Sequence, residues 1–346
     1  MSKRIAIILA AGQSSRMNTK VVKVLHEVCG RPMLDYVIDA CRQSGVEKII
    51  VVVGYGKEQV VERYKDSSDI VFVEQVEQKG TGHAVLCCKE HLVGIEGQAL
   101  ILCGDAPLIR TETLKTLIEK HGSEMAAVTL ATTVLDEPAG YGRIARDDYG
   151  NMQGIVEEND CTDEQRKIKE VNPAYYCFDI PVLLEAIEKI TPNNVKNEYY
   201  LTDAVHIAIS SGHKVVAVTA VAAEDSMGIN NRLQLSEASK IMQRRIQREF
   251  MDNGVTIVDL DNTWIDVRTE IGQDTVIEPF TYIHGEVKIG ANCRVGPFAY
   301  LKDKAELADG TDSNVFSYKG TMKKSVASRK ARRLKKSRSS QKSIVA

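Results

Sequence analysis

The chain opens with an apolar run that breaks off into a small, polar, basic loop. Residues Ile5–Leu25 read IAIILAAGQSSRMNTKVVKVL, and the first five are all apolar. Such a run predicts a buried parallel strand, and Ala10–Gly12 predict a turn without large side chains, against which a large partner can lie. The serines and backbone amides that follow can donate to phosphate oxygens, and Arg16 and Lys23 add two cations. The loop therefore predicts a polyphosphate site; the plainer alternative is a glycine turn with solvated cations.

Two standard phosphate-binding patterns are absent from this segment of the sequence. It contains neither G-x-x-x-x-G-K-[ST] nor G-x-G-x-x-G. The first pattern marks kinase-type P-loops, and the second opens the helix of dinucleotide-binding folds. A P-loop enzyme and an ordinary NAD-binding fold are therefore disfavoured.

Strand-like and helix-like segments alternate along the chain. This alternation is typical of βαβ units, which build a parallel sheet covered by helices on both faces. In such sheets ligands bind beyond the carboxyl ends of the strands, where Gly12 and Asp105 both fall. The predicted strands are Ile5–Ala10, Lys48–Val53, Ile70–Val73, Ala99–Leu102, Ala126–Thr133 and Ala174–Asp179, and the predicted helices are Met33–Ser44, Lys57–Tyr64, Gly82–His91, Thr111–His121 and Ser236–Asn253.

A different pattern begins near Thr263. An aliphatic residue returns at every sixth position from Ile265 to Val295, and the pattern fades after Leu307. This hexapeptide repeat predicts a left-handed parallel β-helix of about two coils. The chain is therefore expected to combine an α/β domain with a short β-helix.

The residues from Lys319 onward differ in charge from the rest of the chain. They hold eleven Lys or Arg and no acid, and because the whole chain carries −2, residues 1–318 carry about −13. We expect this basic tail to be disordered; binding to nucleic acid or to an acidic membrane surface is the alternative. It has no aromatic side chain to stack on bases, which argues against nucleic acid as a partner. The abrupt change suggests a truncated or frame-shifted copy of a longer gene.

Composition limits the class of protein. With 346 residues, 43% of them hydrophobic, the chain can build a large core and more than one domain. No apolar run approaches the ~20 residues that cross a bilayer. The eight cysteines form no C-x-x-C pair, so we expect reduced thiols and no zinc, and we assign Cys103 no chemistry. A cytoplasmic location without a membrane partner is expected.

Several motifs occur together in a known order. The pattern L-A-A-G-x-x-x-R-M followed by K-V-L resembles the signature of sugar-1-phosphate nucleotidylyltransferases. Read onward, the first 300 or so residues resemble the bacterial N-acetylglucosamine-1-phosphate uridylyltransferases, the uridylyltransferase part of a bifunctional family. The motifs that carry this are Gln75, Gln78–Ala84, Leu102–Asp105 with Pro107, Gly140–Ile144, Gly154–Glu157, Thr162–Gln165, Glu198–Asp203 and Asn230–Gln234.

Two positions depart from the family pattern. The chain has Ser14 and Ser15 where the family usually has Gly-Thr, and Val22 where it usually has proline. Serine keeps a hydroxyl donor but gives up the freedom of glycine at positive φ. Losing proline loosens the unfolded chain, an effect of order 1 kcal/mol at most. Neither change removes a charge that the chemistry needs.

The resemblance implies a domain plan. It places a Rossmann-like nucleotidyltransferase domain with a mostly parallel sheet over residues 1–231, a linker helix over 232–262, a truncated β-helix over 263–318 and the basic tail over 319–346. In the family the β-helix carries a second activity, acetyl transfer to glucosamine 1-phosphate. The later coils, with the histidine and lysines of that site, have no counterpart here, so we expect no acetyltransferase activity. Hexapeptide β-helices commonly trimerise, and a homotrimer is a further expectation, weakened by the truncation.

The resemblance also implies a reaction. The phosphate of N-acetylglucosamine 1-phosphate attacks the α-phosphorus of UTP and expels pyrophosphate, and because the nucleophile is already an anion no general base is required. Cations and a metal therefore matter most. Asp105, after the apolar run that ends in Cys103, is a natural ligand for Mg²⁺, although a helix N-cap is the plainer alternative.

Site residues follow by matching positions in the motifs. The resemblance implies Mg²⁺ ligands at Asp105 and Asn230, and catalytic cations at Arg16 and Lys23. It implies nucleotide contacts from Leu9, Ala10, Ala11, Gly12, Gln75, Gly80, Thr81 and Gly104, and sugar-phosphate contacts from Gly142, Glu157, Asn172 and Thr202. Pro173 stands where the family often has a smaller residue. His83 is expected beside the base without a catalytic role.

Two other functions stay open. The loop signature is shared with relatives that use glucose 1-phosphate or other nucleotides, so another sugar 1-phosphate is the first alternative. The second is a non-catalytic binding protein that docks through its basic tail. Nucleotidyl transfer is favoured over this because every charged group that the chemistry needs is present.

Overall fold

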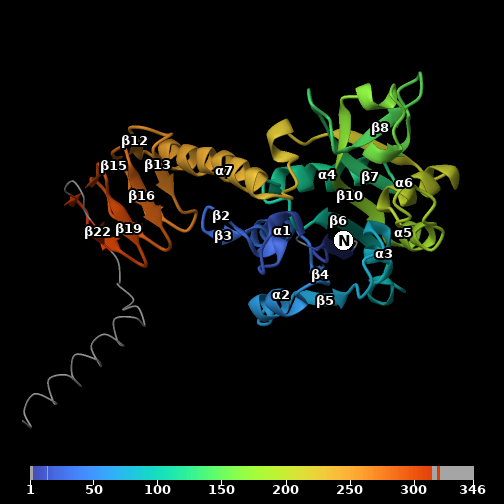
Figure 1. The fold of residues 1–346 in the computed structure, drawn as a ribbon, viewed down its shortest axis with the longest axis horizontal. Coiled ribbons are helices and arrows are strands. Elements are labelled where there is room, and N and C mark those ends of the chain that lie inside the picture. The colour runs from blue at the N-terminus through green and yellow to red at the C-terminus, as the bar shows by residue number, and fades with distance from the viewer. Residues whose placement is uncertain (1–2, 14, 314–317, 320–346) are drawn as a thin grey trace, which may run out of the picture. The chain divides into compact units, whose positions relative to one another are not determined.

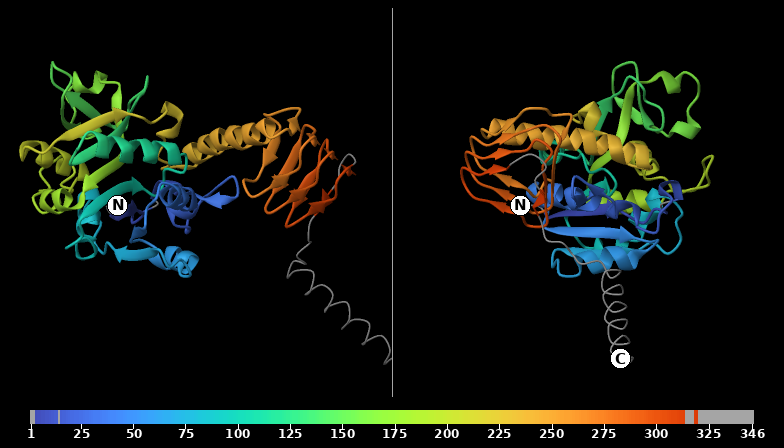
Figure 2. Two further views of the ribbon diagram at one scale, coloured as in Figure 1. Left: turned by 180° about the vertical axis from the view of Figure 1, so that it is seen from behind. Right: turned by 60° about the vertical axis from the view of Figure 1, so that its left-hand side comes forward.

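A computed structural model of the protein describes residues 3–13, 15–313 and 318–319. The chain divides into two units at Met242. The first holds a large sheet with helices on both faces, and the second holds short strands stacked in successive coils (Figures 1 and 2). The expected disorder of the basic tail concerns residues that lie almost entirely outside the described ones. No described helix is both long and apolar enough to span a bilayer.

The first unit is built on a nine-stranded mixed sheet. Its main path runs β11-β7-β10-β6-β1-β4-β5, and β8 and β9 join it through β10. The pairs among β6, β1, β4 and β5 are parallel, whereas β10 runs antiparallel to its neighbours. The strands are β1 Lys3–Leu9, β4 Lys48–Val53, β5 Ile70–Glu74, β6 Gly97–Cys103, β7 Val128–Val134, β8 Gly142–Arg146, β9 Met152–Val156, β10 Glu170–Asp179 and β11 Val215–Thr219, with a separate hairpin of β2 Glu27–Val28 and β3 Arg31–Pro32.

Four of the five predicted helices are present within a few residues, one is not, and two further helices were not predicted. The helices are α1 Met33–Gln43, α2 Lys57–Tyr64, α3 Thr81–Leu86, α4 Thr111–Ser123, α5 Ile180–Ile187, α6 Leu201–Ser210 and α7 Arg232–Asp252. The single helix predicted over Gly82–His91 is wrong, because α3 ends at Leu86 and a separate 3-10 turn covers Lys89–His91. The Cys88 amide donates to the Val85 carbonyl at 2.9 Å, which tightens the chain into a turn between the two.

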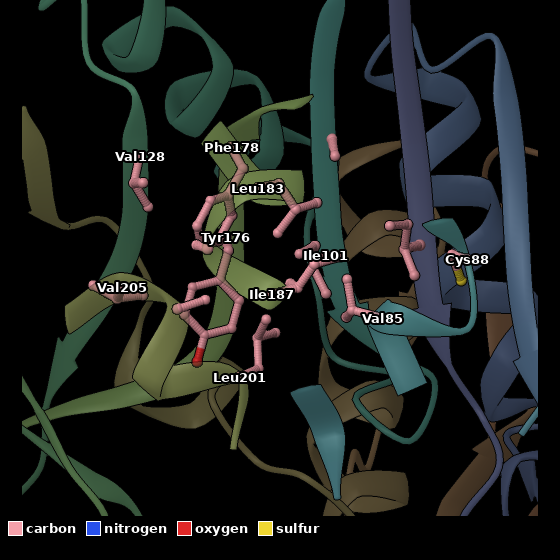
Figure 3. Close-up of a cluster of buried hydrophobic side chains, with 14 of the residues drawn as sticks. Val85, Cys88, Ile101, Val128, Tyr176, Phe178, Leu183, Ile187, Leu201 and Val205 are labelled. Atoms are coloured by element: carbon pink, nitrogen blue, oxygen red, sulfur yellow. The ribbon is translucent and has the colours of Figure 1, made fainter. Parts of the chain in front are cut away.

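The core lies on the two faces of the sheet. Alternate residues of β1 point to opposite faces, so Ile5 and Ile7 belong to one apolar cluster and Ala6 and Ile8 to the other. The first cluster packs under α3, α5 and α6, and Figure 3 shows its residues Val85, Cys88, Ile101, Val128, Tyr176, Phe178, Leu183, Ile187, Leu201 and Val205. The second cluster takes apolar residues from α1, α2 and α4. The predicted sheet covered on both faces is confirmed.

The connections that follow β1 and β6 lead to opposite sides of this strand pair. After β1 the next strand of this sheet along the chain is β4, on one side, and after β6 it is β7, which lies on the other side beyond β10. β1 and β6 are adjacent and parallel, with Leu9 opposite Cys103. Ligands of α/β sheets bind where neighbouring strands send their connections apart. The loops after Leu9 and Cys103 therefore border the natural ligand crevice of this fold.

The second unit contains a parallel β-helix. Its strands form three parallel sheets, β12-β15-β18-β21, β13-β16-β19-β22 and β14-β17-β20. Ile265, Ile283 and Leu301 are fully buried and stack along the axis. The strands are β12 Thr256–Ile257, β13 Thr263–Ile265, β14 Glu270–Ile271, β15 Val276–Ile277, β16 Thr281–His284, β17 Lys288–Ile289, β18 Arg294–Val295, β19 Tyr300–Lys302, β20 Glu306–Leu307, β21 Asp312–Ser313 and β22 Tyr318–Lys319.

The β-helix is longer than the hexad pattern predicts. Each sheet holds three or four described strands, so the expected length of about two coils is wrong. The period persists beyond Val295 because Leu301 and Leu307 keep the inward positions and the small polar Ser313 is buried in the next one. Within this unit the end of α7 joins the first coil, since the Gln243 side chain both accepts from the Ile265 amide and donates to its carbonyl.

Candidate active site

Two adjoining cavities lie at the carboxyl ends of β1 and β6. The first has a volume of about 450 Å³ and the second about 230 Å³. Five residues line both cavities, among them Asp105 and Glu157. The two cavities therefore meet along a shared wall, and Asp105 belongs to that wall.

Most of the predicted site residues line these cavities. The first cavity is lined by Leu9, Ala10, Ala11, Gly12, Lys23, Gln75, Gly80, Thr81 and Asp105. The second is lined by Gly142, Glu157, Asn172, Thr202 and Asn230. Arg16 and Gly104 line neither, although the Gly104 amide donates to the Leu9 carbonyl at 2.9 Å and so ties the ends of β6 and β1 together. Most predicted nucleotide residues line the first cavity and most predicted sugar residues line the second, while Leu9, Thr81 and Glu157 line both. The roles themselves stay predictions.

The four predicted metal and phosphate residues converge on one point. The Lys23 ammonium forms an ion pair with the Asp105 carboxylate and donates to Asn230 Oδ1 at 3.2 Å. Arg16 donates to the same Asn230 oxygen at 2.9 Å. The Ile229 amide donates to the Asp105 carbonyl at 3.0 Å, which brings Asn230 beside Asp105 from 125 residues further along the chain. Residues from three distant segments therefore surround a single cation position.

This donor set fits Mg²⁺. The Asp105 carboxylate and the Asn230 amide oxygen are hard oxygen donors, and both already bind one cation, the Lys23 ammonium. Mg²⁺ usually takes one or two protein oxygens and completes its shell with water and phosphate. The described residues contain no group of three or more His, Cys, Asp or Glu that could enclose an ion by themselves.

The wall opposite the β1 loop is a tightly packed backbone turn. Gly80 has φ +108° and ψ 175°, and a Cβ there would lie 2.5 Å from the Tyr199 carbonyl oxygen. Its own carbonyl accepts from Gln75 Nε2 at 3.0 Å, and that nitrogen also lies 3.1 Å from His83 Nδ1. The amide of Gln75 is thus held in a fixed orientation where it lines the first cavity.

The side chain of Gln78 closes the same wall toward β1. Its amide nitrogen donates to the Ala11 carbonyl at 2.8 Å. Thr81 accepts from the Leu201 amide at 3.0 Å, which joins the start of α3 to the start of α6. These two bonds tie the Gly80 turn to the β1 loop and to the start of α6, so the first cavity has a continuous wall.

A half-buried carboxylate, that of Glu157, lines the second cavity. Glu157 Oε1 accepts from the Thr202 hydroxyl at 3.0 Å. Burial raises the pKa of Glu157 above its ordinary value, while the Thr202 bond and the Lys196 charge act in the opposite direction. A Cβ on Gly142 would lie 2.9 Å from the Ile155 side chain and 3.6 Å from Glu157 Oε2, so glycine keeps the space beside the carboxylate open. The carboxylate can accept from the hydroxyl groups of a sugar.

Asn172 lies at an irregularity in β10. The pairing of β10 with β7 shifts between Val171 and Tyr175, and Ala174 has φ +66°. The Asn172 side chain accepts from the Ala174 amide at 3.0 Å and donates to the Tyr176 hydroxyl at 2.6 Å. These bonds stabilise the bulge around Pro173 and turn this part of the strand into the cavity wall.

Comparison with known proteins agrees with this geometry. Residues 6–168 match the family of MobA-like NTP transferase domains, and residues 268–303 match the six-repeat bacterial transferase hexapeptide family. The residues that match the NTP transferase family contain the β1 loop, the Gly80 turn, Asp105 and Glu157, which are the main walls of both cavities.

The chain also resembles named relatives. It is 47% identical over 286 residues to the bifunctional protein GlmU of Listeria monocytogenes serotype 4b. The matched stretch covers 83% of this chain and 62% of that protein. GlmU of Geobacillus sp. is 48% identical over 286 residues and that of Caldanaerobacter subterraneus 47% over 288, with the same coverage. The chain spans less than two thirds of the length of these curated relatives. The predicted resemblance is confirmed.

Cys103 lines both cavities beside Asp105. Burial raises the pKa of its thiol to about 12, and the neighbouring Asp105 charge acts in the same direction. The thiol is therefore neutral at physiological pH and is no nucleophile. All eight cysteines of the chain are free thiols.

Several residues that line the two cavities were not predicted. Asn159, Lys196, Glu198 and Tyr200 line the first cavity, and Tyr141 lines the second. Tyr141, Glu198 and Tyr200 lie within motifs that carry the resemblance, so the motifs could have indicated them. Nothing in the sequence marks Lys196, an exposed residue in the segment between α5 and α6.

Proposed function

We propose that the chain transfers UMP from UTP to N-acetylglucosamine 1-phosphate in a Mg²⁺-dependent reaction that gives UDP-N-acetylglucosamine and pyrophosphate. The observation that carries the proposal is the convergence of Lys23, Arg16, Asp105 and Asn230 on one point beside the wall that the two cavities share. A reaction that joins two phosphate-bearing substrates needs its positive charge at that place.

The reaction forms one bond and breaks one. An oxygen of the sugar phosphate bonds to the α-phosphorus of UTP, and the bond from that phosphorus to the β-phosphate oxygen breaks, so pyrophosphate leaves with its electron pair. No proton has to be removed from the nucleophile. Lys23 and Arg16 reduce the repulsion between the two anions and offset the charge that develops on the leaving group. Mg²⁺, held by Asp105 and Asn230, would supply further neutralisation of the phosphate oxygens.

Each of the two cavities binds a different substrate. The larger cavity holds the base and ribose between the β1 loop and the Gly80 turn, with the oriented Gln75 amide facing the base edge. The smaller cavity holds the sugar, whose hydroxyl groups donate to Glu157. The identity of the sugar and of the base belongs to this proposal, as do a homotrimer and the absence of acetyl transfer. Each of them stays a prediction.

The proposal is tested by removing the metal-binding carboxylate. Asp105→Asn keeps the size of the side chain but lowers its charge, so we expect kcat/KM for pyrophosphate release to fall at least 100-fold and more Mg²⁺ to be needed for half-maximal rate. Asp136→Asn is the matched control, because Asp136 is an exposed carboxylate that pairs with Lys169 away from both cavities. Unchanged turnover in folded Asp105→Asn protein, shown by an unaltered circular dichroism spectrum, would refute the metal role.

A further inference from the structure

The loop that delivers Lys23 to the site is held by a side chain from outside both cavities. Gln59, on α2, donates from Nε2 to the Lys20 carbonyl at 3.0 Å and accepts through Oε1 from the Val22 amide at 3.3 Å. A carboxamide has a donor and an acceptor side by side, so one side chain binds two backbone groups two residues apart. Lys23, the next residue, bonds to Asp105 and Asn230.

The space for this arrangement is created by Gly56. Gly56 has φ +66°, and a Cβ there would lie 2.7 Å from Val22 Cγ2 and 3.4 Å from Gln59 Nε2. Val22 is fully buried in the second apolar cluster, on the side where α1, α2 and α4 pack. The segment before Lys23 is thus anchored twice, by the Val22 side chain in the core and by Gln59 on its backbone.

The backbone of Val22 has the geometry of a proline. Its φ is −59° and its ψ is 137°, and proline fixes φ near −65°. Proline would hold this point without a hydrogen bond, whereas valine leaves φ free to change and leaves an amide to be satisfied. Gln59 satisfies that amide. The two Gln59 bonds therefore restrain the backbone at Val22, as a proline ring would.

We propose that Gln59 is a positioning residue for Lys23 and acts through its clamp on the backbone of Lys20 and Val22. The proposal rests on the nucleotidyl transfer proposed above. Gln59 touches no substrate, because it lines neither cavity, and it acts only by restricting the backbone from which the Lys23 ammonium extends. A small displacement of a catalytic cation lowers the rate even where substrate binding persists.

The first test separates kcat from KM. Gln59→Ala is expected to lower kcat about three- to tenfold with KM for UTP changed less than twofold. Gln59→Ala combined with Val22→Pro is expected to regain most of the lost kcat, because proline restores the restriction and removes the unsatisfied amide. Glu62→Ala is the matched control: Glu62 is also exposed on α2, and it pairs with Lys65 at the end of that helix and lines neither cavity, so kcat of this variant should stay at the wild-type value.

The second test does not depend on activity. Lys20 is exposed, and its carbonyl is one of the two groups that Gln59 binds, so Gln59→Ala should speed tryptic cleavage after Lys20 several-fold, measured by mass spectrometry of the first fragments. Glu62→Ala should not. Wild-type kcat and an unchanged cleavage rate in Gln59→Ala would overturn the clamp. An inactive wild-type protein with faster cleavage in Gln59→Ala would instead overturn the proposed function and leave the clamp standing.

Discussion

Gly80 is the residue whose replacement is expected to reveal most about the wall of the first cavity. Its φ of +108° and ψ of 175° lie in a region that is essentially restricted to glycine, and placing alanine there costs about 1–3 kcal/mol. The new Cβ would also lie 2.5 Å from the Tyr199 carbonyl oxygen and 2.9 Å from its amide nitrogen. Relieving that overlap costs a further ~1–3 kcal/mol. We expect Gly80→Ala to lower the free energy of unfolding by about 2–6 kcal/mol.

Gly94→Ala is the control for the backbone term. Gly94 also has positive φ, +76°, but nothing lies within 4 Å of its Cβ position, so its replacement should cost only about 1–2 kcal/mol. Urea unfolding followed by circular dichroism compares the two variants. Moving the Gly80 backbone away from Tyr199 would also displace the Gln75 side chain, which donates to the Gly80 carbonyl. We therefore expect KM for UTP to rise at least tenfold in Gly80→Ala and to stay unchanged in Gly94→Ala. Equal stability of the two variants, with a normal KM for UTP, would refute this account of the turn.

Two further predictions concern titrating groups. Burial raises the pKa of Glu157 above 4.5. The protonated Glu157 side chain therefore stabilises the fold fully below that pH, and this stabilisation is lost as pH rises through the raised pKa. Glu157→Gln should unfold at a higher temperature than wild type at pH 8, by a margin that shrinks toward pH 4.5, while its kcat/KM falls tenfold or more. The thiol of Cys103, with a pKa raised to about 12, should resist iodoacetamide at pH 8 in the folded protein, and rapid alkylation of its tryptic peptide would contradict its burial beside Asp105.

The fold was predictable where the pattern was strong. The sequence predicts βαβ units from apolar runs such as Lys48–Val53 and from helical periods such as that of Met33–Ser44. The structure contains these units. β8, β9 and β11 were not predicted. β8 and β9 alternate apolar and polar residues only weakly, whereas β11 reads VVAVT, an apolar run that could have indicated it. The antiparallel direction of β10 depends on tertiary pairing with β6 and β7, which local sequence does not express.

The site was predictable mainly through motifs. Composition alone would leave Asn230 a turn residue, and only its match to a motif marked it as a partner of Asp105. Spacing could not show that Lys23 and Arg16 would meet it, since the contact depends on the Ile229–Asp105 backbone bond. Gln59 and Lys196 have no motif, and their relation to the site appears only when the chain is folded.

The central claim is that the two cavities join a uridine nucleotide to a sugar phosphate. The most direct measurement is a coupled assay of pyrophosphate release by the whole chain with UTP and N-acetylglucosamine 1-phosphate, with and without Mg²⁺, and with glucose 1-phosphate and other nucleoside triphosphates as competitors. We expect release only when Mg²⁺ and both substrates are present, with the highest kcat/KM for UTP and N-acetylglucosamine 1-phosphate. No release with any pair, or a higher kcat/KM for another pair, would contradict the assignment.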